Sequence, residues 1–254
     1  MDNIFINYSL FILFLPLAAF VIQIFFGKKL PRQGDWVSIG AISITLILAI
    51  AMFVGMLLDY NPDFRQEASF TWLDMGAFSI QLGFLVDNIT IIMLLVVALI
   101  STCTHVFSLK YLKGDIRYSR YFAYLGLFTF SMNGIVLANN LISMYMSWEL
   151  VGVSSYLLIG HWFEKESAAN AAKKAFLTNR VGDIGFFIGI MLIYTAIGSF
   201  TFTDIFEGVA GGVLAGTTLT LAGVGLFLGA MGKSSQFPLH IWLPDAMEGP
   251  TPVS

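Results

Sequence analysis

Two ionisable residues lie inside long apolar stretches of this sequence and are the first candidates for chemistry. Glu149 follows Leu141, the start of one apolar stretch, by eight residues, which places it about 12 Å into a helix. Lys233 ends a glycine-rich apolar stretch that begins near Leu219. A carboxyl group and an amine held away from water can take up and release protons, because burial and neighbouring charges have opposing effects on their charged forms. Each could instead be structural, with Glu149 fixing helix packing and Lys233 extending to the membrane surface.

Three further polar residues could support proton transfer. Arg180 and Asp183 are three residues apart, so they can face one another on one side of a helix as an ion pair or as part of a relay. His240 follows Pro238, where a helix is expected to break, and an imidazole can pass protons near neutral pH. These five residues form the predicted site.

Cofactors and metals are not expected in this chain. Its three histidines lack the spacing of a metal-binding sequence, and Cys103 is the single cysteine. The clusters of cysteine and histidine that hold iron–sulfur groups or haem are therefore missing from the sequence.

The composition indicates the elements that must position these residues. Of 254 residues, 57% are hydrophobic and only 11% are charged, which leaves too little polar surface for a water-soluble globule. The lipid bilayer is the expected surrounding, and the small net charge of -3 argues against nucleic acid as a partner. An all-α membrane protein with about seven transmembrane helices is predicted. The predicted spans are 9–26, 36–58, 88–109, 121–137, 141–163, 176–197 and 219–235.

Basic residues alternate between the two sides of this predicted bundle. Three groups fall on alternate connections, which should be cytoplasmic. The multi-pass chain is therefore expected to have its N-terminus outside, with Arg65 on the outer side and Lys233 within a helix. The three groups are Lys28, Lys29 and Arg32; Lys110, Lys113, Arg117 and Arg120; and Lys165, Lys173, Lys174 and Arg180.

Two local features interrupt the helical pattern. Apolar residues alternate with small or polar ones along 78–84, and with the run at 70–73 they predict a small β-hairpin at the outer surface, turning at 74–76. Pro238 lacks an amide hydrogen, so the last helix should break near 234–237, just after Lys233. A broken helix at membrane depth is tolerated only where it faces protein or a wet cavity.

Four stretches carry a resemblance to a known family. They read SRYFAYLGLFTFSM, MYMSWELVGVSSYLLIGHW, KKAFLTNRVGD and GKSSQFPLHIWLPDAMEGPTPVS, and they resemble, in order, the subunit L or chain 5 family of NADH:quinone oxidoreductase. The resemblance implies a proton-translocating, antiporter-like membrane subunit with two inverted five-helix repeats, each with a broken helix, a buried glutamate and buried lysines. The family's glutamate falls on Glu149 and its lysine on Lys233, while the arginine and aspartate of RVGD fall on Arg180 and Asp183.

The resemblance also implies a setting and a mechanism. The chain is expected to be an N-terminal fragment, with helices 1–3 and the hairpin in 1–109 and an incomplete first repeat in 110–254 that forms a half-channel. Its partners would be other membrane subunits of respiratory complex I in a bacterial inner (plasma) membrane. Quinone reduction elsewhere would switch the pairing of Glu149 with Lys233 and so move a proton, with no redox chemistry in this chain.

Two alternatives stay open. The chain also resembles one of the components of multi-subunit sodium/proton antiporters, although FLTNRVGD favours the complex I branch. It could also be a structural membrane anchor in which Glu149 and Lys233 only hold helices together.

Overall fold

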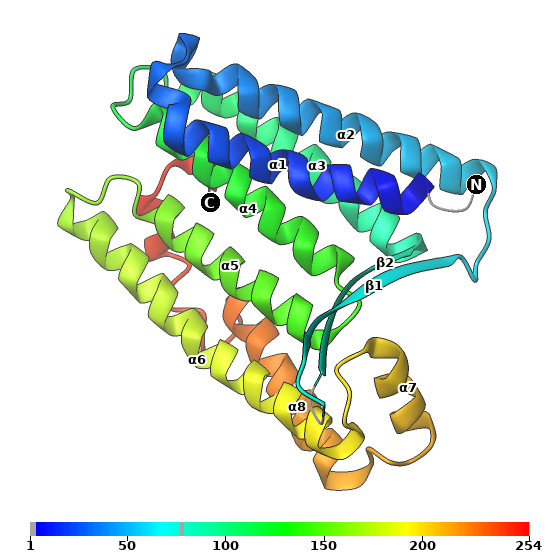
Figure 1. Cartoon of the computed structure of the whole chain (residues 1–254). Helices are drawn as coiled ribbons and strands as arrows, with labels where there is room; N and C mark the ends of the chain where they lie inside the picture. The colour runs from blue at the N-terminus through cyan, green and yellow to red at the C-terminus, as the bar shows by residue number, and fades with distance from the viewer. Residues whose placement is uncertain (1–3, 77–78, 254) are drawn as a thin grey trace. The chain divides into compact units, whose positions relative to one another are not determined.

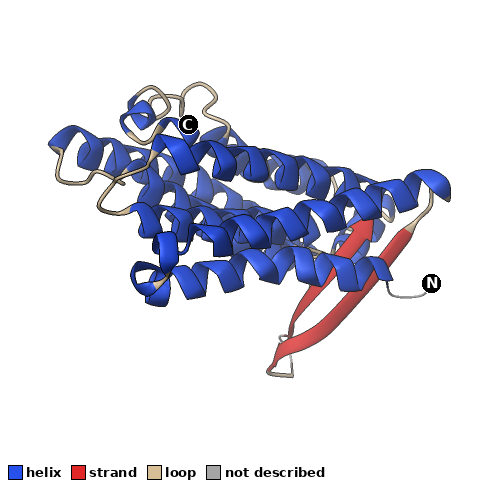
Figure 2. Ribbon diagram, turned by 90° about the horizontal axis from the view of Figure 1, so that it is seen from above, coloured by secondary structure: helices blue, strands red, loops and turns tan. Residues whose placement is uncertain are grey.

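The structure is a computed structural model that describes residues 4–76 and 79–253, and it consists of long helices with one small sheet (Figures 1 and 2). The chain divides into two compact units. The first contains the described residues up to Ser69, Gly83–Ala138 and Thr251–Val253, and the second contains Phe70–Leu82 and Asn139–Pro250.

Long helices account for most of both units. The first unit contains α1 (Ile4–Phe26), α2 (Asp35–Leu58), α3 (Asn88–Tyr111) and α4 (Tyr118–Leu137), and the second contains α5 (Leu141–Ile159), α6 (Glu166–Ile197), α7 (Phe202–Ala210) and α8 (Gly216–Lys233). Five of the described helices, α1, α2, α3, α5 and α6, are long and apolar enough to cross a membrane. With α4, of 20 residues, and α8, of 18, they match the seven predicted stretches. The predicted all-helical membrane fold is confirmed.

Three boundaries in the second unit differ from the prediction. α6 begins at Glu166, ten residues before the predicted start, because its first ten residues include five alanines, the strongest helix formers. Lys173 and Lys174 therefore lie on a helix and not in a loop. α5 ends at Ile159, ahead of its cap Gly160, and the nine-residue helix α7 is too short to register as a span.

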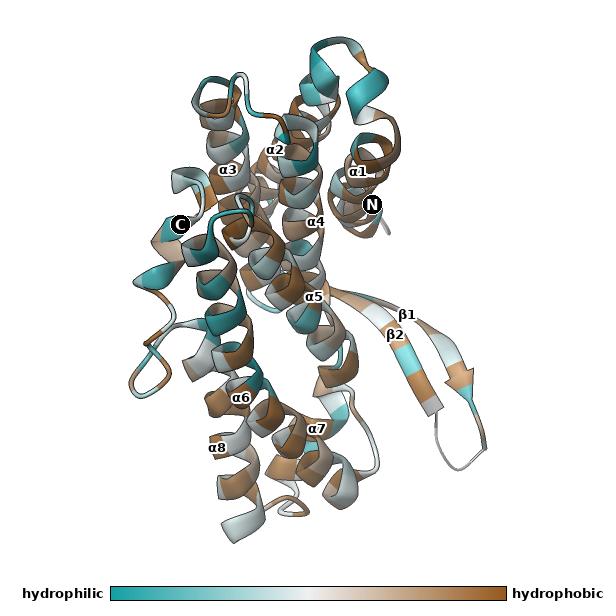
Figure 3. Cartoon of the chain, turned by 90° about the vertical axis from the view of Figure 1, so that its left-hand side faces the viewer, coloured by the Kyte–Doolittle hydropathy of each residue, from teal (hydrophilic) through white to brown (hydrophobic). Residues whose placement is uncertain are grey.

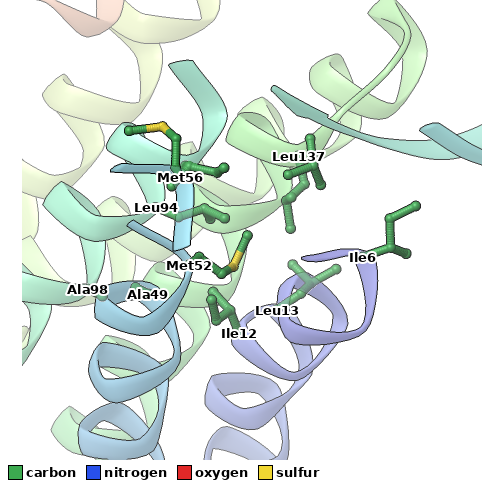
Figure 4. Close-up of a cluster of buried hydrophobic side chains, with 11 residues drawn as sticks. Ile6, Ile12, Leu13, Ala49, Met52, Met56, Leu94, Ala98 and Leu137 are labelled. Atoms are coloured by element: carbon green, nitrogen blue, oxygen red, sulfur yellow. The ribbon is translucent and has the colours of Figure 1, made fainter. Parts of the chain in front are cut away.

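Large apolar side chains fill the core of the first unit (Figure 4). Met52 of α2 and Leu94 of α3 are almost fully buried there, as is Ile12 of α1. Leu137, the last residue of α4, belongs to the same cluster. Side chains from four helices thus interlock in one core.

α4 belongs to the first unit because it packs directly on α1. A Cβ placed on Gly126 would lie 3.0 Å from the carbonyl oxygen of Pro16, so the two backbones approach closely. The Asn133 amide also donates to the Ile12 carbonyl oxygen at 3.1 Å. The two units therefore divide after Ala138, and not at the predicted domain boundary between 109 and 110.

The predicted hairpin is present as two paired strands, β1 (Arg65–Asp74) and β2 (Ser79–Asp87) (Figure 2). Its turn begins where it was predicted. The Asp74 carboxylate accepts from the amide of Gly76 at 3.0 Å, and Gly76 has a φ of +79°, which glycine adopts without strain. Phe78, part of the predicted alternation, lies outside the described residues.

Glycines bring α6 and α8 of the second unit into backbone contact. A Cβ on Gly182 would lie 2.7 Å from the Leu228 carbonyl oxygen, and one on Gly225 would lie 2.7 Å from the Gly185 carbonyl oxygen. Small residues permit such close approach between helices in a membrane, where packing rather than water exclusion drives association. α8 ends at Lys233, so the predicted helix break before Pro238 is confirmed.

Candidate functional site

Four charged side chains from three helices gather in the second unit. α5 supplies Glu149, α6 supplies Arg180 and Asp183, and α8 supplies Lys233. α6 carries hydrophilic residues along its first half and apolar residues along its second half (Figure 3). The cluster therefore lies where the polar half of α6 meets its neighbours.

Glu149 forms a salt bridge with Arg180. The helix that carries Glu149 begins with a cap, because the Asn140 side chain accepts from the amide of Ser143 at 2.8 Å. The guanidinium of Arg180 also lies over the ring of Phe176, with its carbon 4.6 Å from the ring centroid. Arg180 is thus held between an aromatic face and a carboxylate.

Asp183 is the most deeply buried of the four charges, with only 2% of its side chain exposed. The indole N–H of Trp148 donates to its Oδ1 at 2.8 Å. The other oxygen, Oδ2, lies 3.9 Å from Arg180 and 3.8 Å from the Lys233 amine. One carboxylate oxygen therefore faces two cations.

Lys233 ends α8, and 15% of its side chain is exposed. Its Nζ is buried and has no hydrogen-bond partner within residues 4–76 and 79–253, and the same holds for Glu149 Oε1 and Asp183 Oδ2. Trp242 holds the end of α8 in place, since its indole N–H donates to the Gly232 carbonyl oxygen at 3.0 Å. Lys233 thus combines a fixed backbone with an amine whose hydrogen-bonding capacity is not used by the described residues.

The four groups alternate in sign along one path. Glu149 contacts Arg180, Arg180 approaches Asp183, and Asp183 approaches Lys233. A single charge at membrane depth costs several kcal/mol, and pairing with opposite charge lowers that cost. Two acids and two bases balance here, so a proton added at one end changes the partners available along the whole path.

The sequence predicted these four residues, but the contacts differ in detail from the direct pair expected of Glu149 and Lys233. The salt bridges found in the described chain join each of them to a residue of α6. Trp148 was missed, although its position next to Glu149 was a usable signal. Its contact with Asp183 depends on the packing of α5 on α6, which no residue spacing reveals.

His240 lies apart from the four charges. Its ring is exposed and lies against Phe237, with centroids 5.7 Å apart, and no hydrogen bond or salt bridge among the described residues joins it to the cluster. Its role in a relay stays a prediction. The part of the chain that the structure describes also contains no group of three or more His, Cys, Asp or Glu residues that could hold a metal.

Two family profiles match the chain. One, described as NADH:quinone oxidoreductase/Mrp antiporter, TM, matches residues 138–254, and the other, described as the N-terminus of NADH-ubiquinone oxidoreductase (complex I) chain 5, matches residues 72–122. The first match includes all four residues of the charge cluster.

Curated relatives are similar over most of this chain. NAD(P)H-quinone oxidoreductase subunit 5 from the chloroplast of Draba nemorosa is 44% identical over 231 residues, covering 89% of this chain and 31% of the relative. NADH-quinone oxidoreductase subunit L of Neisseria meningitidis serogroup A is 41% identical over 262 residues, covering 96% of this chain and 38% of the relative. The chain thus spans about a third of the length of these relatives.

Solved structures share the fold. An archaeal membrane-bound sulfane sulfur reductase superposes with a TM-score of 0.81 at 18% identity, over 96% of this chain and 48% of the other. The Mrp complex of Dietzia sp. DQ12-45-1b superposes with a TM-score of 0.80 at 22% identity, over 97% of this chain and 26% of the other.

Proposed function

Because this chain belongs to the NADH:quinone oxidoreductase/Mrp antiporter family of membrane subunits, we propose that it helps to move protons as an antiporter-like subunit L of respiratory complex I. Its partners would be other membrane subunits of that complex, and electron transfer from NADH to quinone would take place on other chains. The relatives most similar in sequence are named as subunits of such oxidoreductases, which supports this assignment.

The observation that carries the proposal is the alternating path of Glu149, Arg180, Asp183 and Lys233. In this mechanism a change of electric field weakens the attraction between Glu149 and Arg180. Arg180 then moves toward Asp183, which already lies within 3.9 Å. Each step exchanges one pairing of opposite charges for another, so no charge is left alone in the membrane.

The proton itself leaves from Lys233. When Arg180 compensates Asp183, the carboxylate attracts the Lys233 ammonium less strongly, and the ammonium gives up a proton to water or polar side chains beside the helix break. The resulting neutral amine takes up a proton from the opposite side when Arg180 returns to Glu149. Both exchanges conserve charge, and neither needs an electron carrier in this chain.

Proton pumping by the complete complex tests this mechanism. Glu149→Gln and Lys233→Ala should each reduce pumping per NADH oxidised by about tenfold, equivalent to roughly 1.4 kcal/mol in a barrier, with little change in the amount of assembled complex. Lys174→Ala is the matched control, because that amine forms an exposed salt bridge with Asp245 away from the cluster. Unchanged pumping in both cluster variants would leave only a structural anchor.

A sodium/proton antiporter is the second candidate. The matching profile names the Mrp antiporter as well as the oxidoreductase, and the fold superposes on an Mrp complex. The identity of 41–44% to oxidoreductase subunits favours complex I. Neighbouring genes distinguish the two: other complex I subunits support the oxidoreductase, and small antiporter subunits support the antiporter.

The proposed orientation in a bacterial inner membrane has the N-terminus outside. It is tested with a cysteine placed at Lys113, between α3 and α4, after Cys103 has been changed to serine. The basic residues of this connection predict that it is cytoplasmic, so an impermeant reagent added outside should not label it. Labelling from outside would overturn the orientation.

A further inference from the structure

Trp148 of α5 contacts both members of the pair formed by Asp183 and Lys233. Its indole N–H donates to Asp183 Oδ1 at 2.8 Å, and the Lys233 amine lies 5.7 Å from the centroid of its ring. The ring is itself held by Phe186 in an edge-to-face contact with centroids 5.1 Å apart. The indole is therefore a fixed support next to two charges.

Gly152 lies one helical turn after Trp148 on the same face of α5. A Cβ at this position would lie 2.7 Å from the Lys233 amine nitrogen, closer than a carbon and a nitrogen can approach. The missing side chain of Gly152 thus leaves the space that the ammonium occupies. The amine sits against a ring on one side and a bare helix backbone on the other.

We propose that Trp148 and Gly152 form a seat for the Lys233 ammonium and are positioning residues for proton transfer. The indole N–H occupies Asp183 Oδ1, so Arg180 and Lys233 must compete for Oδ2. Both cations lie beyond hydrogen-bond distance of that oxygen, at 3.9 and 3.8 Å, and neither has captured it. Trp148 makes the two pairings mutually exclusive, and Gly152 fixes where Lys233 waits. This inference rests on the proposed function.

The first test is Gly152→Ala in the complete complex. The new methyl group displaces only the far end of a flexible lysine, so assembly and stability should stay unchanged while pumping falls roughly tenfold, as expected when a reacting group is misplaced by less than about 1 Å. The pH profile of pumping should also shift, which a purely structural role would not cause. Gly223→Ala is the matched control, because its Cβ would meet nothing within 4 Å.

The second test is Trp148→Phe, which keeps an aromatic face and removes the N–H donor. Asp183 Oδ1 then becomes available, so Arg180 and Lys233 can each bind one oxygen of the carboxylate. The charges should lock together, so pumping should fall several-fold while the thermal stability of the complex stays unchanged or rises. Trp72→Phe, an exposed position on β1, is the control. Normal pumping in the Trp148 variant would overturn the seat.

The pair of Gly152→Ala and Lys233→Ala separates this inference from the proposed function. If Gly152 acts only through the ammonium, Gly152→Ala should have no further effect once Lys233 is alanine. A further loss in that background would overturn the seat and leave the function standing. Normal pumping in Lys233→Ala alone would instead overturn the proposed function.

Discussion

The two units of this chain pack their helices in different ways. In the first unit, large side chains such as Met52, Leu94 and Ile12 interlock (Figure 4). In the second unit, glycines let the backbones of α6 and α8 touch. Lipid tails are as apolar as leucine, so both arrangements must gain their stability from close packing. The difference shows that a core without charges can use bulk, whereas the helices that carry charges are held by backbone contact.

Their buried polar groups differ in the same direction. In the first unit, the hydroxyl of Ser131 donates to the Leu127 carbonyl oxygen at 2.6 Å, and that of Ser9 donates to the Phe5 carbonyl oxygen at 2.8 Å. These are neutral groups satisfied by their own helices. In the second unit, Asp183 Oδ2 is charged and shared. Polar groups in the first unit support structure, and those in the second can change partners.

The largest effect on stability is expected where the backbones of α6 and α8 touch. Gly225→Leu would place a Cβ 2.7 Å from the Gly185 carbonyl oxygen, and neither backbone can move without separating the helices. The loss should reach at least the upper end of the range for overpacked cores, about 3 kcal/mol, in denaturation of the purified protein in detergent. Gly223→Leu on the same helix should be close to neutral. Equal losses in the two variants would remove the contrast between the units.

A smaller loss is expected in the side-chain core of the first unit. Leu94→Ala should lower the free energy of unfolding by about 2 kcal/mol, near the low end for buried leucines, because lipid supplies no hydrophobic term and only packing contacts are lost. Leu99→Ala, at a half-exposed position of the same helix, is the control. Proton pumping per assembled complex should stay normal in both. Reduced pumping per complex in Leu94→Ala would show that the first unit is more than a scaffold.

The smallest effect is expected at the start of α7, away from the charge cluster. Hydroxyl groups of Ser199 and Thr201 donate to the Asp204 carboxylate and hold its pKa below the ordinary value of 3.8. The carboxylate therefore stabilises this helix above about pH 4, and that contribution is lost as the pH falls through the lowered pKa of the folded state. Asp204→Asn should cost less than about 1 kcal/mol, since the site is exposed.

Hydrogen exchange of the α7 amides measures this effect. At pH 7, Asp204→Asn should speed exchange in α7, whereas Glu207→Gln on the same helix should not. Pumping should be normal in both variants. If the Asp204 variant exchanged at the normal rate, its hydrogen bonds would contribute nothing to the helix.

The sequence was sufficient to predict the long helices, because apolar stretches of membrane length leave few alternatives. It also predicted the break after Lys233, where proline removes a backbone donor. It missed the first turns of α6 and all of α7, since neither is apolar over a membrane-spanning length. The assignment of α4 to the first unit was missed as well, because that depends on close approach to α1 at Gly126.

The charged residues of the site were predictable because ionisable groups are rare in apolar helices. Their pairing was not predictable. Depth along separate helices places Glu149 and Lys233 only in one dimension, whereas the contacts depend on which faces of α5, α6 and α8 meet. The same applies to Trp148 and Gly152, whose residue types also occur in ordinary helix packing.

The central claim is that the charges of the second unit act as one coupled path. A double-mutant cycle with Glu149→Gln and Lys233→Ala, measured as proton pumping per assembled complex, tests it most directly. Because Arg180 and Asp183 connect the two ends, the double variant should lose much less pumping than the sum of the two single losses, each expressed as a free energy. Strictly additive losses would contradict the account, since they would show that Glu149 and Lys233 act independently.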